Sequence, residues 1–160
     1  MFYNLKTIES MHPLFQELEN CRGVSQKPEH HPEGDVFTHL VQVLFHAMRE
    51  SNDLDLIFAA MLHDVGKQIN TLGHEKYSCD LLKGCISEKT GWLIKHHMRI
   101  KLFLSGEMKK RKKIEYLYSH PFFADLILLN RWDNMGRDPL RKIEYDRVVI
   151  IETLIQNSTA

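Results

Sequence analysis

Apolar residues recur at intervals of three and four along most of the 160-residue chain, which is the spacing of amphipathic helices. The clearest stripe consists of Val36, Leu40, Val43, Leu44 and Met48, and Asp35 stands where a helix cap is needed. No segment sustains the alternation of apolar and polar residues that is typical of a half-buried strand. The pattern therefore predicts an all-α helical bundle.

The other helix boundaries follow from residues that begin or end helices. The first dozen residues are ambiguous, and glycine, serine and proline residues make 22–34 a loop. A second loop is expected at 98–112, with a short amphipathic stretch beginning at Lys109. Helices are predicted from Pro13 to before Gly23, from Leu54 to about Val65 with a stop at Gly66, from about Glu75 to Leu82, from Ser87 to His97, from Pro121 to about Trp132, and from Leu140 to Gln156.

Length and composition indicate one domain, residues 1–160, because neither a linker nor a repeat interrupts the chain. Lys and Arg number 21 against 21 Asp and Glu, so the whole molecule is not drawn to nucleic acid or anionic membranes by its net charge. The longest apolar run, residues 56–62, is too short to span a membrane. Three cysteines without C-x-x-C spacing and the lack of a secretory signal predict reduced thiols and a cytoplasmic location.

The candidate chemistry lies in the sequence Ala60-Met-Leu-His63-Asp64-Val-Gly66-Lys67, where a histidine and an aspartate follow an apolar helix. Burying an imidazole and a carboxylate there is costly unless something compensates, and a divalent cation does so directly. Two adjacent residues reach one ion only where the helix ends, so the other ligands must come from other helices.

Two further residues stand in suitable places. His39 lies one turn into its helix, beside apolar Leu40, and Asp133 ends a later helix just before Gly136. With His63 and Asp64 they make a set of nitrogen and oxygen ligands that suits Mn, Fe, Co, Ni or Zn. A metal held there would make water nucleophilic and polarise a phosphoryl oxygen.

The order of these motifs resembles the HD-domain superfamily of metal-dependent phosphohydrolases. It is most similar to the HD domain of bacterial tRNA nucleotidyltransferases, the CCA-adding enzymes. The resemblance covers about residues 28–138, with a C-terminal helix at about 139–156 beyond it. Five blocks carry it: His30-His-Pro-Glu-Gly-Asp35-Val-Phe-Thr-His39, Leu62-His-Asp-Val-Gly-Lys67, Gly73-His74-Glu75, Leu93-Ile-Lys-His-His97-Met98 and Asp133-Asn-Met-Gly-Arg137.

The resemblance implies an HD-domain helical bundle that binds one or two divalent ions, of Mn, Ni, Co, Fe, Zn or Mg. It implies His39, His63, Asp64 and Asp133 as ligands of one ion and His74 and His97 as ligands of a second, with Asp64 bridging. Lys67 and Arg137 would face substrate phosphate, although Lys67 could instead complement a helix dipole. The Gly-rich loop and paired carboxylates of a nucleotidyltransferase head are missing from these residues, so nucleotide addition is not expected.

The expected activity is therefore hydrolysis of a phosphoester in a nucleotide or an RNA end, of the 2′,3′-cyclic phosphodiesterase or phosphatase type. One alternative is a nucleoside mono- or triphosphate hydrolase of the nucleotide pool, and another is a non-catalytic RNA-binding module with a structural metal. The run Lys109, Lys110, Arg111, Lys112 and Lys113 is either a solvated helix face or a nucleic-acid contact. The sequence implies no protein partner and leaves monomer and homodimer open.

Overall fold

All regular secondary structure in residues 5–158, the part of the chain that the computed structural model describes, is helical. Among these residues, none of the helices combines the length and the apolar character that crossing a lipid bilayer requires. The all-α prediction is confirmed. In chain order the elements are α1 (Leu5–Glu19), α2 (Val36–Glu50), α3 (Leu54–Leu62), the 3-10 helix η1 (Val65–Gln68), α4 (His74–Leu81), α5 (Glu88–His96), α6 (Arg99–Leu104), α7 (Arg111–Ser119), α8 (Phe123–Met135) and α9 (Arg147–Ser158).

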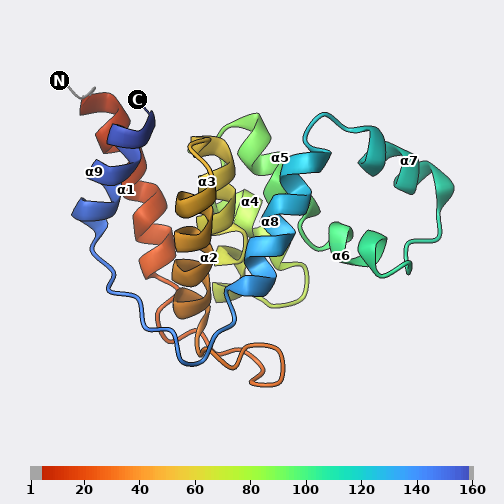
Figure 1. Cartoon of the computed structure of the whole chain (residues 1–160), viewed down its shortest axis with the longest axis horizontal. Coiled ribbons are helices and arrows are strands. Elements are labelled where there is room, and N and C mark those ends of the chain that lie inside the picture. Colours follow the sequence, from red (N-terminus) through yellow and green to blue (C-terminus); the bar gives the residue numbers. More distant parts are fainter. Residues whose placement is uncertain (1–4, 159–160) are drawn as a thin grey trace.

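Helices α2 and α3 form the centre of the bundle (Figure 1). Helix α1 packs against both of them and carries α9 on its outer side, whereas α8 packs against α2 and α3 from the other side. Helix α5 packs on α3, α4 and α8, and η1 packs on α4. Helices α6 and α7 extend beyond α5 and α8, on the side of the molecule opposite α1 and α9.

Side-chain caps fix the start of three helices that carry functional residues. Asp35 Oδ1 accepts from the Thr38 amide at 2.8 Å, and Asp53 Oδ1 accepts from the Asp55 amide at 3.0 Å. Ser87 Oγ likewise accepts from an amide of α5. Such caps satisfy amide groups that have no partner within the helix. The three predicted N-terminal boundaries are therefore confirmed.

The first helix differs from its prediction, because α1 begins at Leu5 and contains Pro13 in its interior. Proline removes the amide that would donate to the carbonyl of Glu9. Glu9 is exposed, so water can hydrate that carbonyl, while Leu14, Phe15 and Leu18 bury the opposite face in the core. The expected helix start at Pro13 was wrong because packing on one face outweighs the lost hydrogen bond.

The last helix also differs, because α9 begins at Arg147 and not at Leu140. Leu140, where the helix was expected to begin, is 89% exposed. Gln42 holds the preceding connection by donating to the carbonyl of Asp138 at 2.8 Å. Asp146 Oδ1 then accepts from the Val148 amide at 3.0 Å and starts the helix. Residues 139–146 therefore cross the molecule as a connection between α8 and α9.

The stretch 98–112 contains a helix that the sequence did not predict. Helix α6 is only six residues long, and its Ile100 is fully buried. One buried residue in such a short element gives no periodic pattern, which explains why the sequence suggested a loop.

Candidate metal centre

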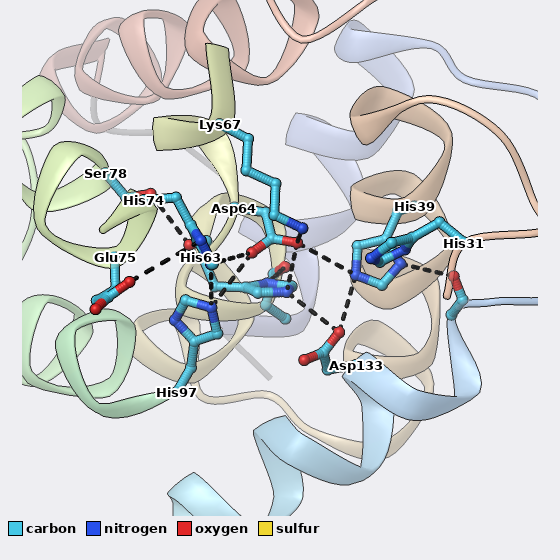
Figure 2. Close-up of polar contacts among 12 residues, drawn as sticks. His31, His39, His63, Asp64, Lys67, His74, Glu75, Ser78, His97 and Asp133 are labelled. Carbon is cyan, nitrogen blue, oxygen red and sulfur yellow. Dashed lines mark hydrogen bonds and ion pairs between the residues drawn. The ribbon is translucent and has the colours of Figure 1, made fainter. Parts of the chain in front are cut away.

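Four side chains, from α2, from α8 and from the turn after α3, meet in one cluster (Figure 2). His39 comes from α2, His63 and Asp64 directly follow α3, and Asp133 lies near the end of α8. His39 Nε2 lies 2.9 Å from Asp133 Oδ1 and 3.6 Å from Asp64 Oδ2. His63 Nε2 lies 3.5 Å from Asp133 Oδ1 and 3.6 Å from Asp64 Oδ2. All four are buried, so the structure brings together the residues that the sequence had proposed as ligands of one ion.

Backbone carbonyls fix which nitrogen of each of these imidazoles faces the carboxylates. His63 Nδ1 donates to the carbonyl of Ala60 at 2.9 Å, and His39 Nδ1 donates to that of Gly136 at 2.8 Å. The Nε2 atoms are therefore the ones available to a ligand. His63 Nε2 is fully buried and has no hydrogen-bond partner among the described residues. A buried lone pair beside two carboxylates fits a cation.

A second pair of histidines lies on the other side of Asp64 (Figure 2). His74 Nε2 and His97 Nε2 lie 3.0 Å and 3.3 Å from Asp64 Oδ1. Their Nδ1 atoms pair with the carbonyls of Thr71 and Ile94, so Nε2 is again the free nitrogen. Asp64 therefore presents Oδ1 to one histidine pair and Oδ2 to the other. This geometry fits a carboxylate that bridges two ligand sets.

The charges of the cluster are compensated from several sides. Burial alone raises the pKa of the Asp64 carboxyl, but the charges of His63 and Lys67 outweigh it, and the pKa lies well below its usual value. Burial likewise raises the pKa of Asp133, and interactions with His63 and His39 hold it well below its usual value. Both carboxylates are therefore anionic and able to act as ligands.

The pKa of His39 is raised by the neighbouring carboxylates. Burial alone lowers the pKa of His39, but hydrogen bonds to Asp133 and Glu33 outweigh it and raise the pKa to about 9. His39 Nε2 and Asp133 Oδ1, 2.9 Å apart, therefore share a proton. Metal binding at this site would therefore displace that proton.

Close packing of Gly66 against α4 positions the His63-Asp64 pair. A Cβ atom on Gly66 would lie 2.1 Å from the carbonyl oxygen of His74, so only glycine lets η1 approach α4 this closely. The Gly66 amide donates to Ser78 Oγ at 2.8 Å, and that hydroxyl donates to the carbonyl of His63 at 3.1 Å. The predicted role of Gly66 as a helix stop was wrong, because α3 has already ended at Leu62.

The two cations that were expected to face phosphate lie beside the carboxylates. Lys67 Nζ lies 3.0 Å from Asp64 Oδ2, and Arg137 Nη2 lies 3.3 Å from Asp133 Oδ1. Both side chains line a cleft of about 1080 Å³, which the two carboxylates also line. Lys67 also donates to Gln26 Oε1 at 2.8 Å, which ties it to the loop over the cleft.

Three residues of this centre escaped the sequence analysis. Lys101 lines the cleft, and its Nζ lies 2.9 Å from Asp133 Oδ2. Glu33 Oε1 lies 2.9 Å from both His31 Nδ1 and His39 Nδ1, with the carboxylate buried. Glu33 and His31 belong to a sequence block that had been quoted for its resemblance, whereas Lys101 stands in a stretch that was expected to be a loop.

The basic run at Lys109, Lys110, Arg111, Lys112 and Lys113 does not line the cleft. It ends the α6–α7 loop and begins α7, and Lys112 and Lys113 line a separate hollow of about 150 Å³. The structure thus divides the sequence-proposed residues into a central cluster and a distant basic segment.

Comparison with known families matches residues 36–143 to the HD domain. The chain belongs to the HD-domain family. The matched segment contains the six histidines and aspartates of the cluster, which lie in α2, α4 and α8 and directly after α3 and α5.

Part of the chain is also similar to proteins of known description. The chain is 34% identical over 91 residues to the multifunctional CCA protein of Nitrosospira multiformis. The matched region covers 52% of this chain and 22% of that protein. The chain is 39% identical over 88 residues to the corresponding protein of Thioalkalivibrio sulfidiphilus, with 51% and 22% covered. The similar protein of Burkholderia mallei is 34% identical over 90 residues, with 52% and 22% covered. The matched region thus spans about a fifth of the length of these relatives.

Proposed function

We propose that this HD-domain protein is a metal-dependent phosphohydrolase that cleaves a phosphoester in a nucleotide or an RNA end. The observation that carries the proposal is the cluster of imidazole Nε2 atoms around two buried carboxylates, which line a cationic cleft. The location expected from the reduced cysteines is the cytoplasm.

The donor set fits a divalent ion of the first transition row. His39, His63, Asp64 and Asp133 would hold one ion, and His74 and His97 with Asp64 would hold a second. When bound, the metal supplies a Lewis acid that acidifies water and polarises a phosphoryl oxygen.

The cations of the cleft supply the electrostatic part of the reaction. Lys67 and Arg137 lie where they can bind the phosphoryl oxygens of a substrate and offset the charge that develops on them. Lys101 holds Asp133 from the opposite side, through Oδ2, and so orients its other oxygen. In the reaction, the oxygen of water forms a bond to phosphorus, one P–O ester bond breaks, and the departing alcohol takes a proton.

Two features support an RNA end or a 2′,3′-cyclic nucleotide as the substrate. The sequence is similar to the HD part of CCA-adding enzymes, and relatives over this region are described as multifunctional CCA proteins. The cleft volume of about 1080 Å³ is slightly above the usual range for small-molecule sites, so the cleft has room for more than a phosphate group.

A substrate screen tests the proposal. The chelator-treated protein is assayed with Mn, Ni, Co or Mg against 2′,3′-cyclic nucleotides, nucleoside mono- and triphosphates, and RNA ending in a cyclic phosphate. We expect metal-dependent cleavage of the cyclic esters. Hydrolysis of nucleoside mono- or triphosphates alone would favour a nucleotide-pool enzyme, and RNA binding without any hydrolysis would favour the non-catalytic module.

A variant separates catalysis from folding. Asp64→Ala removes the carboxylate that both histidine pairs share, so it should abolish metal binding and turnover. Its far-UV circular dichroism should remain that of the wild type, because the helices are capped and packed elsewhere. Retained turnover in Asp64→Ala would reject the mechanism.

A further inference from the structure

A strong local charge asymmetry follows α5 in the sequence. Residues 95–119 contain eight Lys and Arg residues and two Glu residues, a net charge of +6, in a chain whose total is zero. The remaining residues together carry −6. A local excess of this kind in an otherwise neutral protein is typical of a surface that contacts a polyanion.

Seven of these eight cations and both glutamates belong to the α6–α7 arm, which we define as residues 99–119. The arm extends from the bundle beyond α5 and α8 (Figure 1). Arg111 forms an ion pair with Glu115 at 2.9 Å, so one cation of the run is already neutralised. Among the ion pairs of residues 5–158, none involves Arg99, Lys112 or Lys113. These three exposed cations are available to a ligand.

The three cations surround a hollow between the arm and α5. This arm pocket has a volume of about 150 Å³ and is lined by His96, Arg99, Met108, Lys112, Lys113, Tyr116 and Leu117. Cations and an aromatic ring around one hollow offer partners both for a phosphate and for a nucleobase.

A stack of rings holds Tyr116 at the rim of the arm pocket. Trp92 stacks with the rings of both His96 and His120, at centroid distances of 4.3 Å and 3.9 Å. Trp92 Nε1 donates to Tyr116 Oη at 3.1 Å, yet Tyr116 is half exposed. The ring is thus fixed on one side and open on the other, which suits a base-stacking platform.

The arm pocket and the catalytic cleft lie on opposite sides of the junction between α5 and α6. His97, Met98 and Lys101 line the cleft, whereas His96 and Arg99 line the arm pocket. Neighbouring residues of the stretch 96–101 therefore line either the cleft or the arm pocket. A polynucleotide whose end lies in the cleft needs to cross only this junction to reach the cations of the arm.

We propose that the α6–α7 arm is the docking surface for single-stranded RNA whose end lies in the cleft. Arg99, Lys112 and Lys113 contact backbone phosphates, and Tyr116 stacks against one base. The inference rests on the proposed function, since it takes an RNA end as the occupant of the cleft. It gives the substrate class, because a free mononucleotide held in the cleft would leave the arm unused.

Direct binding tests the docking surface without depending on hydrolysis. A fluorescein-labelled single-stranded RNA is titrated with the chelator-treated full chain, and fluorescence anisotropy is measured at several salt concentrations. Lys112→Glu/Lys113→Glu should weaken binding at least tenfold. Losing two phosphate contacts should also reduce the slope of log affinity against log salt by about 1.4, at about 0.7 per contact for single strands.

The matched control is Lys83→Glu/Lys142→Glu, which changes the net charge equally at two exposed positions outside the arm. It should stay within twofold of the wild type. Tyr116→Leu should weaken binding while Tyr116→Phe retains most of it, because only the ring is needed for stacking. Equal affinity of Lys112→Glu/Lys113→Glu and the wild type, equal loss in the control pair, or binding to anionic phospholipid vesicles in place of RNA would overturn the proposal.

Turnover then separates the two proposals. Lys112→Glu/Lys113→Glu should lose kcat/KM on an oligonucleotide that ends in a 2′,3′-cyclic phosphate, but not on a 2′,3′-cyclic mononucleotide. If no phosphoester is cleaved while RNA binding still depends on the arm, the proposed function fails and the docking surface stands. If the mononucleotide is cleaved while substitutions in the arm leave the RNA affinity unchanged, the docking surface fails and the proposed function stands.

Discussion

His74 and His97 face each other across 3.0 Å through their Nε2 atoms, beside Oδ1 of Asp64. When both imidazoles are neutral, two lone pairs meet at this distance, and only a shared proton or a cation relieves the repulsion. Burial alone lowers the pKa of His97, so this ring is the neutral partner, whereas the hydrogen bond to Asp64 outweighs burial and raises the pKa of His74. The pair is therefore suited to a second ion.

The number of bound ions tests this relationship. Isothermal titration of the chelator-treated protein with Mn²⁺ should give two ions per chain, and His74→Asn/His97→Asn should give one. His12→Asn is the control, because His12 is exposed and remote from the cluster, and it should still bind two. A stoichiometry of one in the wild type would limit the site to the ligands of His39 and His63.

Glu33 should set the metal affinity through His39 without being a ligand itself. Its Oε1 lies 2.9 Å from His39 Nδ1, and a carboxylate behind a ligand imidazole orients the ring and makes it more basic. We expect Glu33→Gln to weaken Mn²⁺ binding about 10–100-fold. Glu29→Gln, at an exposed position of the same loop, should leave the affinity unchanged. Equal affinities in both variants would show that Glu33 serves only the loop.

Gly66 and Gly91 make a matched pair for stability. A Cβ atom at Gly66 would overlap the carbonyl oxygen of His74 at 2.1 Å, and backbone atoms cannot move aside as a side chain can. Gly66→Ala should therefore destabilise the protein by about 1–3 kcal/mol in urea unfolding. Gly91 lies within α5, where a Cβ atom meets only Ile86 Cδ1 at 3.7 Å, so Gly91→Ala should stabilise by about 0.5–1 kcal/mol. The same sign for both would contradict the packing argument.

Lys89 links three helices through carboxylates, and its contribution should depend on pH. Its Nζ lies 2.6 Å from both Asp53 at the start of α3 and Asp125 on α8. Burial alone raises the pKa of Asp53, but the interaction with Lys89 outweighs it and lowers this pKa. The stabilisation is therefore complete above the unfolded pKa of about 3.9 and is lost as the pH falls through the folded value.

Lys89→Met tests that pH dependence. It should cost up to about 1 kcal/mol of unfolding free energy at pH 7, because the pair is partly exposed. The difference from the wild type should shrink when urea unfolding is repeated at pH 3. A difference that is independent of pH would show that Lys89 acts through packing of its aliphatic chain.

Local patterns predicted much of this molecule, and the errors have identifiable causes. The cap at Asp35, the helix start at Leu54 and the apolar stripe of α2 were readable because the residues that signal them lie close together in the sequence. The helix starts expected at Pro13 and Leu140 were wrong, because packing against residues far away in the sequence decides where these two helices begin. The cluster of His39, His63, Asp64 and Asp133 was found because ordered blocks marked it, and its distances required the fold. Lys101 and the separation of the basic run from the cleft carried no local signal.

The central claim is that His39, His63, Asp64 and Asp133 hold a divalent metal. Anomalous diffraction from crystals grown with Mn²⁺ tests it most directly, because it locates the ion without reference to activity. We predict an anomalous peak within bonding distance of the Nε2 atoms of His39 and His63 and of both carboxylates. Crystals that hold Mn²⁺ elsewhere, or that show no peak among these four side chains, would contradict the account.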